Sequence, residues 1–213
     1  MKKQENFKII ITMAFNFEKI DPYRGREFEY DLVGKMNIED PTFPLELNKL
    51  QEKVKKRGYQ IKQKNSLPFK EAVEISKKFQ TWDPQSPNKE FARELRLALA
   101  ERLGLETNEQ LENLKIYSAV GGPLDSHGID CFIAFNSPGG KEYIVTYDVT
   151  KNPDKEIPKG ADLLIEGEIP DPSDKDYSEK KFLETIDNYA AQSAIVLKQK
   201  MEKQQQEFER RAA

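Results

Sequence analysis

Cysteine and histidine are almost absent from this chain of 213 residues, which contains one of each, Cys131 and His127. One cysteine cannot form an intramolecular disulfide, and a single pair of such residues is too small for a zinc site built from cysteine and histidine. Apolar residues surround Cys131, so we expect its thiol to be a buried packing group and not a nucleophile.

Long hydrophobic runs and an excess of positive charge are also lacking. No window is long and apolar enough to span a bilayer, and no small-residue cleavage site follows the start "MKKQENFKIIITMAF". We therefore expect a soluble, cytoplasmic protein that does not associate with membranes. The formal net charge of −3 and the pI near 5.5 mean that any surface for nucleic acid has to be a local patch.

Charged residues make up 33% of the chain, and the apolar 37% is gathered in runs that can form one core. The length fits one domain with additions, or two small domains. The proline-containing stretch "DPQSPN" (83–88) is the candidate boundary. It divides the chain into a β/α N-terminal region over 1–82 and an α/β core over 83–213.

Local patterns predict the elements of both regions. β-branched residues predict a strand over 7–20, and apolar–polar alternation predicts another over 26–38. Apolar spacing and helix-end residues predict helices over 44–59 and 68–82.

From residue 86 the expected order is helix, strand, hairpin, strand, helix, which is typical of a mixed α/β fold with a small mixed sheet flanked by helices. The helices are expected over 86–106, capped by Ser86, over 107–114, with a capping box between Thr107 and Gln110, and over 178–211. The strands are expected over 115–120, 129–135, 141–150 and 161–169.

Two single acids stand at the same end of the expected hairpin. Side chains alternate along a strand, so Asp148 shares a face with Thr146 and Thr150. Antiparallel pairing through the turn "NSPGG" places Asp130 opposite the end of the strand that contains Asp148. Two carboxylates so close repel each other unless a cation lies between them, and Mg²⁺ or Mn²⁺ prefers such oxygen ligands. We therefore expect a metal at Asp130 and Asp148 that can activate water and stabilise charge on a phosphate.

This arrangement of a helix, a hairpin strand with one Asp, and an acid near the end of the next strand resembles the PD-(D/E)XK nuclease superfamily over about residues 86–200. The resemblance implies a restriction-endonuclease-like core and a magnesium-dependent hydrolase that cleaves phosphodiester bonds in DNA. It also implies that Asp130 and Asp148 are the metal ligands.

One position departs from the pattern of the family. The lysine of the family lies two residues after the second acid, where this chain has Thr150. Lys151 should face the other side of the strand and Lys155 lies in the following loop, and either could supply the amine. The resemblance also implies an acid on the preceding helix, for which Glu94 is the first choice and Glu90 the second.

Each candidate also has a structural interpretation. Asp130 can be a turn residue after Gly128, and Asp125 and His127 can be turn residues that do not touch the metal or substrate. Asp148 is harder to explain in this way, because aspartate is disfavoured inside a strand. The missing lysine and the acidic net charge leave a second function open, a catalytically inactive nuclease fold that binds nucleic acid or a protein.

The most basic stretch, residues 53–64, contains no acid and could follow a phosphate backbone. The candidate nucleic-acid-binding residues are Lys53, Lys55, Lys56, Arg57, Tyr59 and His127. The alternative is a solvated helix end whose lysines complement the helix dipole. The long C-terminal helix loses its apolar face in its last third, where we expect it to fray or project into solvent. This helix is also the candidate surface for a protein partner.

Overall fold

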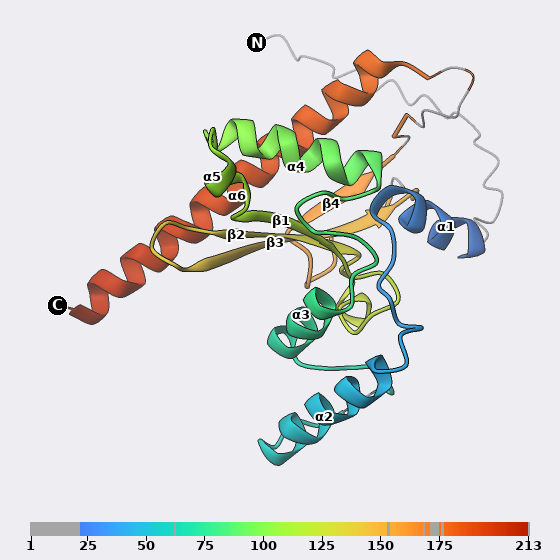
Figure 1. The fold of residues 1–213 in the computed structure, drawn as a ribbon, viewed down its shortest axis with the longest axis vertical. Helices are drawn as coiled ribbons and strands as arrows, with labels where there is room; N and C mark the ends of the chain where they lie inside the picture. The colour runs from blue at the N-terminus through green and yellow to red at the C-terminus, as the bar shows by residue number, and fades with distance from the viewer. Residues whose placement is uncertain are drawn as a thin grey trace, which may run out of the picture.

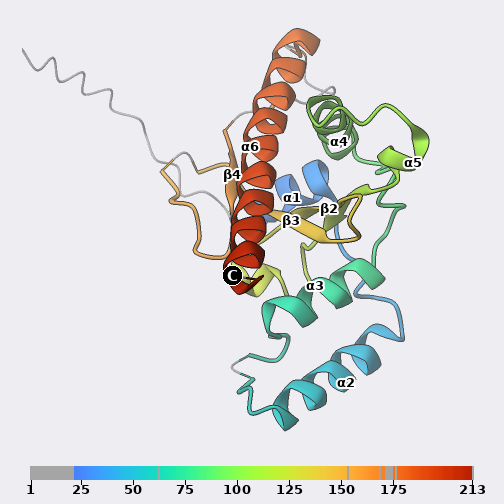
Figure 2. The same ribbon diagram turned by 90° about the vertical axis from the view of Figure 1, so that its left-hand side faces the viewer.

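The computed structural model describes residues 22–61, 63–152, 154–167, 169–170, 175 and 177–212. The strand expected over 7–20 lies outside these ranges. Within them, four strands form one sheet in the order β1-β2-β3-β4, and helices cover both of its faces (Figure 1 and Figure 2). The mixed α/β class predicted from the sequence is confirmed.

The helices and strands follow one another from the N-terminal region to the long last helix. The helices are α1 (Pro22–Val33), α2 (Phe43–Lys56), α3 (Phe69–Lys78), α4 (Glu90–Arg102), α5 (Asn108–Leu111) and α6 (Glu179–Ala212). The strands are β1 (Leu114–Ser118), β2 (Cys131–Asn136), β3 (Glu142–Thr150) and β4 (Leu163–Glu166), and a 3₁₀ turn covers Asp125–His127.

The register of the sheet brings the two hairpin acids together. β1, β2 and β3 are antiparallel neighbours, and Cys131 of β2 is paired with Tyr147 of β3. Asp130 and Asp148 come one residue further along each strand, so they stand opposite each other at the open end of the hairpin. β4 is parallel to β3 and pairs only with its last four residues, from Tyr147 to Thr150.

Alternation along the strands separates two cores. Cys131, Ile133 and Tyr147 are fully buried on the face that α4 and α6 cover, as expected for Cys131. Phe132 and Ala134 belong to the opposite face, where they pack with residues of α2 and α3. Figure 1 shows this layering, with α4 and α6 on one side of the sheet and α3, then α2, on the other. Asp130 and Asp148 share the second face, because they alternate with the residues of the first.

The strand predicted over 26–38 is wrong, because most of this segment is helix α1. Phe28, Leu32 and Val33 lie four and five residues apart and pack in the core of α4 and α6, which a helix permits and a strand does not. Only Met36 keeps a β-bridge, to Gln80. The helix ends at Gly34, whose φ of +66° is in the left-handed region.

Most other elements agree with the sequence, with one wrong cap. α2, α3, the short α5 with its capping box, the hairpin and α6 are confirmed within a few residues. α4 begins at Glu90 with Lys89 as its N-cap, whereas Ser86 forms a turn in which its N–H donates to the carbonyl of Asp83. The expected boundary between 82 and 83 falls between α3 and α4, and both cores contain residues from both sides of it.

Candidate functional site

Asp130 and Asp148 are almost completely buried, with exposed fractions of 4% and 2%. Their strands hold them in place through the main chain. The N–H of Asp130 donates to the carbonyl of Tyr147 at 2.8 Å, and its Oδ2 accepts from the N–H of Val149 at 2.7 Å. Asp130 therefore bonds across the hairpin and not within the turn that precedes it.

Lys155 supplies the amine beside these acids. Its Nζ lies 2.9 Å from Oδ1 and 2.7 Å from Oδ2 of Asp148. The short loop between β3 and β4 carries this lysine back over the strand that it has just left. Oδ2 of Asp148 is buried and accepts no hydrogen bond of good geometry, so the ion pair leaves part of its bonding capacity unused.

Two further carboxylates act on this pair through their charge. Glu29 comes from α1, and Asp125 comes from the 3₁₀ turn, where its Oδ2 accepts from the N–H of Gly121 at 3.3 Å. Burial is the main cause that raises the pKa of Glu29 to about 7, and Asp125 and Asp148 add to it. We call Glu29, Asp125, Asp130 and Asp148 the acid cluster.

The acid cluster holds more negative charge than its surroundings compensate. The pKa of Asp130 is raised to about 8, mainly by burial, and the charges of Glu29, Asp148 and Asp125 contribute to this rise against the hydrogen bond from Val149. Near neutral pH, Asp130 therefore favours its protonated form unless a cation is close. Either a proton or a cation relieves the repulsion, which gives the cluster the electrostatics of a cation-binding site.

The donors of the acid cluster suit a hard cation. They are all carboxylate oxygens, which Mg²⁺ and Mn²⁺ prefer, and Oδ2 of Asp148 has bonding capacity left. Within the described residues, no three or more His, Cys, Asp or Glu side chains are arranged so that they could hold a metal ion. Magnesium is often bound through only one or two carboxylates together with water and phosphate oxygens, so Asp130 and Asp148 are the residues that would hold it.

The other expected catalytic residues have different contacts. Lys151 places its Nζ 4.8 Å from the centre of the Phe28 ring, and Oγ1 of Thr150 accepts from a main-chain N–H of the following loop at 3.1 Å. Glu94 accepts a hydrogen bond from the neighbouring Arg93 at 3.0 Å, and its charge acts on Tyr177. The structure brings Lys155, and not these three residues, to the aspartates.

His127 has a structural contact. Its Nε2 lies 2.8 Å from the carbonyl oxygen of Leu67, and its ring stands edge-on to Phe69. These contacts connect the 3₁₀ turn to the start of α3. They direct the His127 ring toward α3. Asp125, two residues before His127, belongs to the acid cluster instead.

Glu29 is the acid that the sequence analysis missed. Alternation of apolar residues suggested a strand here, which gave no reason to place Glu29 near the hairpin. A helical period was also present, because Phe28, Leu32 and Val33 share one side of a helix. That period could have identified α1, but its position beside the end of the sheet depends on tertiary contacts with α4 and β3 (Figure 1).

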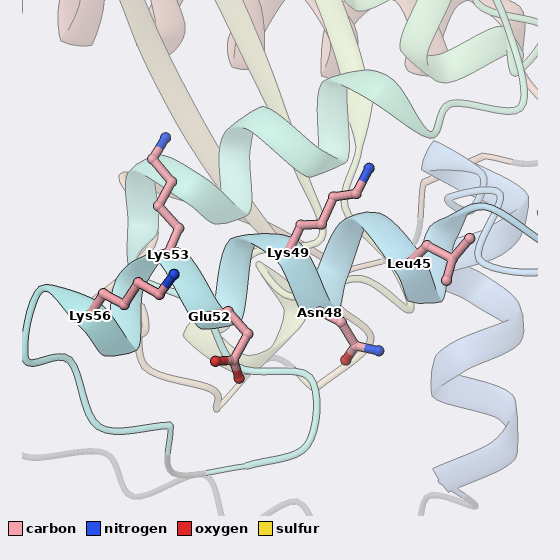
Figure 3. A pocket seen from close by; sticks show the side chains of 6 residues that line it. All are labelled: Leu45, Asn48, Lys49, Glu52, Lys53 and Lys56. Carbon is pink, nitrogen blue, oxygen red and sulfur yellow. The ribbon is translucent and has the colours of Figure 1, made fainter.

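The basic residues of α2 differ in how far they are already paired. Arg57 forms an ion pair with the buried Glu71 of α3, and Lys55 pairs with Glu52 at 2.9 Å. Lys53 and Lys56 are exposed and have no ion pair within the described residues. Together with four other side chains they line a shallow groove of about 700 Å³ on the outer face of α2, drawn in Figure 3: Leu45, Asn48, Lys49 and Glu52. None of these residues belongs to the acid cluster.

Comparison with family models, with curated proteins and with solved structures found no match to this chain. Among the described helices, none combines the length and the apolar character needed to cross a membrane.

Proposed function

We propose that this protein is a metal-dependent nuclease that hydrolyses phosphodiester bonds in DNA, with its active site at the acid cluster. The observation that carries the proposal is the cross-strand pair Asp130 and Asp148 with the ammonium of Lys155 in contact with Asp148. An apolar hairpin gains no stability from two buried aspartates, so their burial calls for a functional explanation.

Asp130 and Asp148 would hold Mg²⁺ or Mn²⁺. The bound ion would lower the pKa of a water molecule and offset charge on the phosphate. Lys155 reaches Asp148 from the loop and can orient the attacking water or bind a phosphate oxygen. Glu29 can act as the proton acceptor at neutral pH. Its pKa is raised to about 7, and a general base works best when its pKa lies near the operating pH. In the reaction the water oxygen bonds to phosphorus and gives a proton to Glu29, the bond to the leaving sugar oxygen breaks, and that oxygen takes a proton from solvent water.

A second candidate function is a catalytically inactive nuclease fold that binds nucleic acid or a protein. The ion pair between Lys155 and Asp148 favours it, because it already neutralises one acid of the pair. Under this alternative the acids and Lys155 would only stabilise the end of the hairpin.

The surface for DNA is proposed at the exposed lysines of α2. Lys53 and Lys56 are exposed and line the same groove on this helix, where a phosphate backbone could contact both. Arg57 is assigned instead to the ion pair with Glu71. A protein partner is proposed for the end of α6, where Phe208 is exposed and lies beside Lys141 of the β2–β3 turn.

Calorimetric titration of Mn²⁺ into the wild type and into Asp148→Asn tests the metal site. We expect binding to the wild type that the substitution abolishes. Plasmid and single-stranded DNA are then incubated with the same two proteins in Mn²⁺, and cleavage by the wild type alone is expected. Lys155→Met is the second variant, for which metal binding should remain while cleavage falls to a low but measurable rate. Absence of binding at millimolar Mn²⁺ would refute the nuclease and leave the binding module.

A further inference from the structure

The loop that carries Lys155 is attached to an edge of β3 that none of the described strands covers. β4 pairs with β3 only from Tyr147 onward, so the main-chain groups before it need other partners. Asp162, the last residue of the loop, supplies them. Its N–H donates to the carbonyl of Thr146 at 3.0 Å, and its Oδ2 accepts from the N–H of Thr146 at 2.9 Å.

The Thr146 side chain strengthens this attachment. Its Oγ1 lies 2.9 Å from Oδ2 of Asp162 and 3.1 Å from the carbonyl oxygen of Gly160, and it accepts from the N–H of Asp162 at 3.0 Å. Thr146 is buried and lies on the same face of β3 as Asp148, two residues before it. The end of the loop is therefore fixed close to the aspartate that Lys155 contacts.

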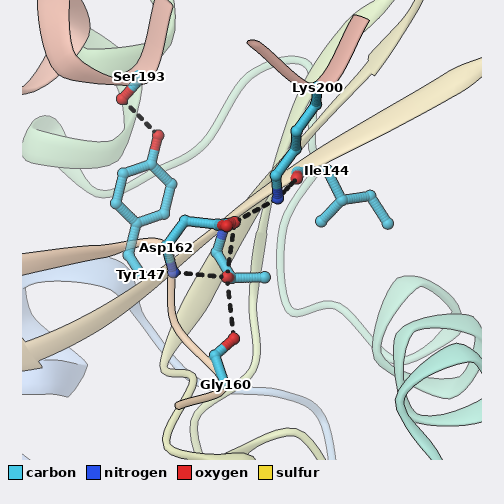
Figure 4. Close-up of polar contacts among 7 residues, drawn as sticks. Ile144, Tyr147, Gly160, Asp162, Ser193 and Lys200 are labelled. Atoms are coloured by element: carbon cyan, nitrogen blue, oxygen red, sulfur yellow. Dashed lines mark hydrogen bonds and ion pairs between the residues drawn. The ribbon is translucent and has the colours of Figure 1, made fainter. Parts of the chain in front are cut away.

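Lys200 of α6 completes the arrangement from the other side of the sheet. Its Nζ donates to Oδ2 of Asp162 at 2.6 Å and to the carbonyl of Ile144 at 2.7 Å. Figure 4 shows Lys200 reaching Asp162 and Ile144, and the Thr146 hydroxyl bonded to both Asp162 and Gly160. We call Thr146, Asp162 and Lys200 the loop clamp.

The middle of the loop has little room to move against the 3₁₀ turn. A Cβ at Gly160 would lie 2.2 Å from the carbonyl oxygen of His127, and a Cβ at Gly128 would lie 2.8 Å from Pro158. The main chain therefore passes directly over residues 127 and 128. Lys155 lies between this contact and the end of β3, so the clamp and the contact together limit where its ammonium can be.

We infer that Asp162 and Lys200 are positioning residues of the nuclease, which hold the β3–β4 loop so that Lys155 meets Asp148. This inference rests on the proposed function for its catalytic consequence. The clamp replaces the fixed placement that a lysine on the strand itself, at the position of Thr150, would have had. A long side chain on an unsupported loop would sample many positions, and small misplacements of a reacting group are costly in rate.

Hydrogen–deuterium exchange of the loop amides tests the loop clamp independently of catalytic activity. In Lys200→Met and in Asp162→Asn, the amides of Lys155 and Asp162 should exchange at least about tenfold faster than in the wild type, because their loop opens more often. Asp187→Asn is the matched control, since it breaks an ion pair of α6 with Arg102 that does not touch the loop. It should leave these amides unchanged, and Lys200→Arg should restore protection.

Cleavage kinetics in Mn²⁺ measure the catalytic consequence. Lys200→Met is expected to lower kcat about tenfold while KM changes less than twofold. Combined with Lys155→Met it should cause no further loss, because a positioning residue has no effect once its target is gone. Additive losses would indicate a general structural defect and would overturn the inference.

The two proposals fail in different ways. A wild type that binds Mn²⁺ but cleaves no DNA would overturn the nuclease, and exchange would still decide whether the clamp orders the loop. Unchanged exchange in both Lys200→Met and Asp162→Asn would overturn the clamp even in an active enzyme. Thermal unfolding of each variant establishes whether it is folded. If Asp162→Asn does not fold, the milder variant Lys200→Met alone tests the clamp.

Discussion

Lys155 holds both carboxylate oxygens of Asp148, at 2.9 and 2.7 Å, although seven residues separate the two in sequence. The chain turns back between them, so a loop residue takes the place expected for a lysine on the strand. The hydroxyl of Thr150, which stands at that expected position, accepts a hydrogen bond from the N–H of Asn152. The departure from the nuclease pattern is therefore compatible with an amine at the aspartates.

Lys155→Met should destabilise the metal-free protein by about 1 to 2 kcal/mol. The substitution leaves Asp148 buried without a counter-charge, and the partial exposure of the lysine limits the loss. Adding Asp148→Asn removes the buried charge, so the double variant should recover most of the loss. Urea unfolding at pH 7 with a chelator measures both. Strictly additive losses would contradict a direct coupling of the two side chains.

Asp130→Asn should stabilise the metal-free protein at pH 8 and much less at pH 5. Burial raises the pKa of Asp130 from 3.8 to about 8, so between these values the folded state binds a proton that the unfolded state has released. The contribution of this group to the unfolding free energy therefore falls as the pH rises through that window. Asparagine has no charge to bury and can still accept from Val149.

Thermal unfolding with a chelator at the two pH values measures the effect. The advantage of Asp130→Asn should reach about 1 to 2 kcal/mol at pH 8. Comparison with the wild type at each pH removes the contribution of the other titrating groups. An equal difference at both pH values would mean that Asp130 is not protonated in the folded protein.

Lys53→Gln combined with Lys56→Gln should weaken DNA binding without loss of stability. These two lysines have no ion pair within the described residues, so they are available to phosphates. The slope of log affinity against log salt should fall by about two, one for each contact. Fluorescence anisotropy with a labelled duplex measures this. Lys180→Gln, an exposed lysine of α6, is the control and should change neither quantity.

Arg57→Gln should have the opposite outcome to the lysine pair. Arg57 neutralises Glu71, whose side chain is only 5% exposed, and the hydrogen bond from Arg57 lowers the pKa of Glu71. Its loss should lower the melting temperature and leave the salt slope of DNA binding unchanged. A reduced salt slope with an unchanged melting temperature would instead mean that Arg57 contacts DNA.

Gly34→Ala should cost about 3 kcal/mol, more than Gly58→Ala at about 1 kcal/mol. Both glycines have φ in the left-handed region, +66° and +85°, so both substitutions strain the backbone. Only at Gly34 would the added Cβ also meet a neighbour, 2.0 Å from the ring of Trp82. Thermal unfolding compares the two, and equal losses would mean that the contact with Trp82 is unimportant.

The sequence predicted the elements whose signals are local. The hairpin, the capping box of α5 and the helix α4 each follow from residues within one segment, and the register of the hairpin placed Asp130 opposite Asp148. Segment 26–38 was predicted as a strand because two periods overlapped there. Its helical form depends on Leu32 and Val33 packing in a core formed by residues much later in the chain.

Which acid and which lysine join the aspartates depends on contacts between segments far apart in the sequence, and local patterns do not encode these contacts. Glu94 and Glu29 are both helix acids, and only the packing of α1 against α4 and β3 decides that Glu29 joins the aspartates. Lys151 and Lys155 were equal candidates by spacing. The contact of Lys151 with Phe28 and the turn of the β3–β4 loop separate them, and neither is encoded in a short motif.

β4 runs parallel to β3, yet the described residues between them form no helix, and the crossover between Thr150 and Leu163 has only about a dozen residues. This is near the shortest path by which a chain can return to the start of a parallel neighbour. The crossover should therefore tolerate almost no deletion, since losing one or two residues would pull β4 out of register. Related sequences, when aligned, should vary in length at the β2–β3 turn, while the interval from Asp148 to Asp162 keeps a fixed count of residues.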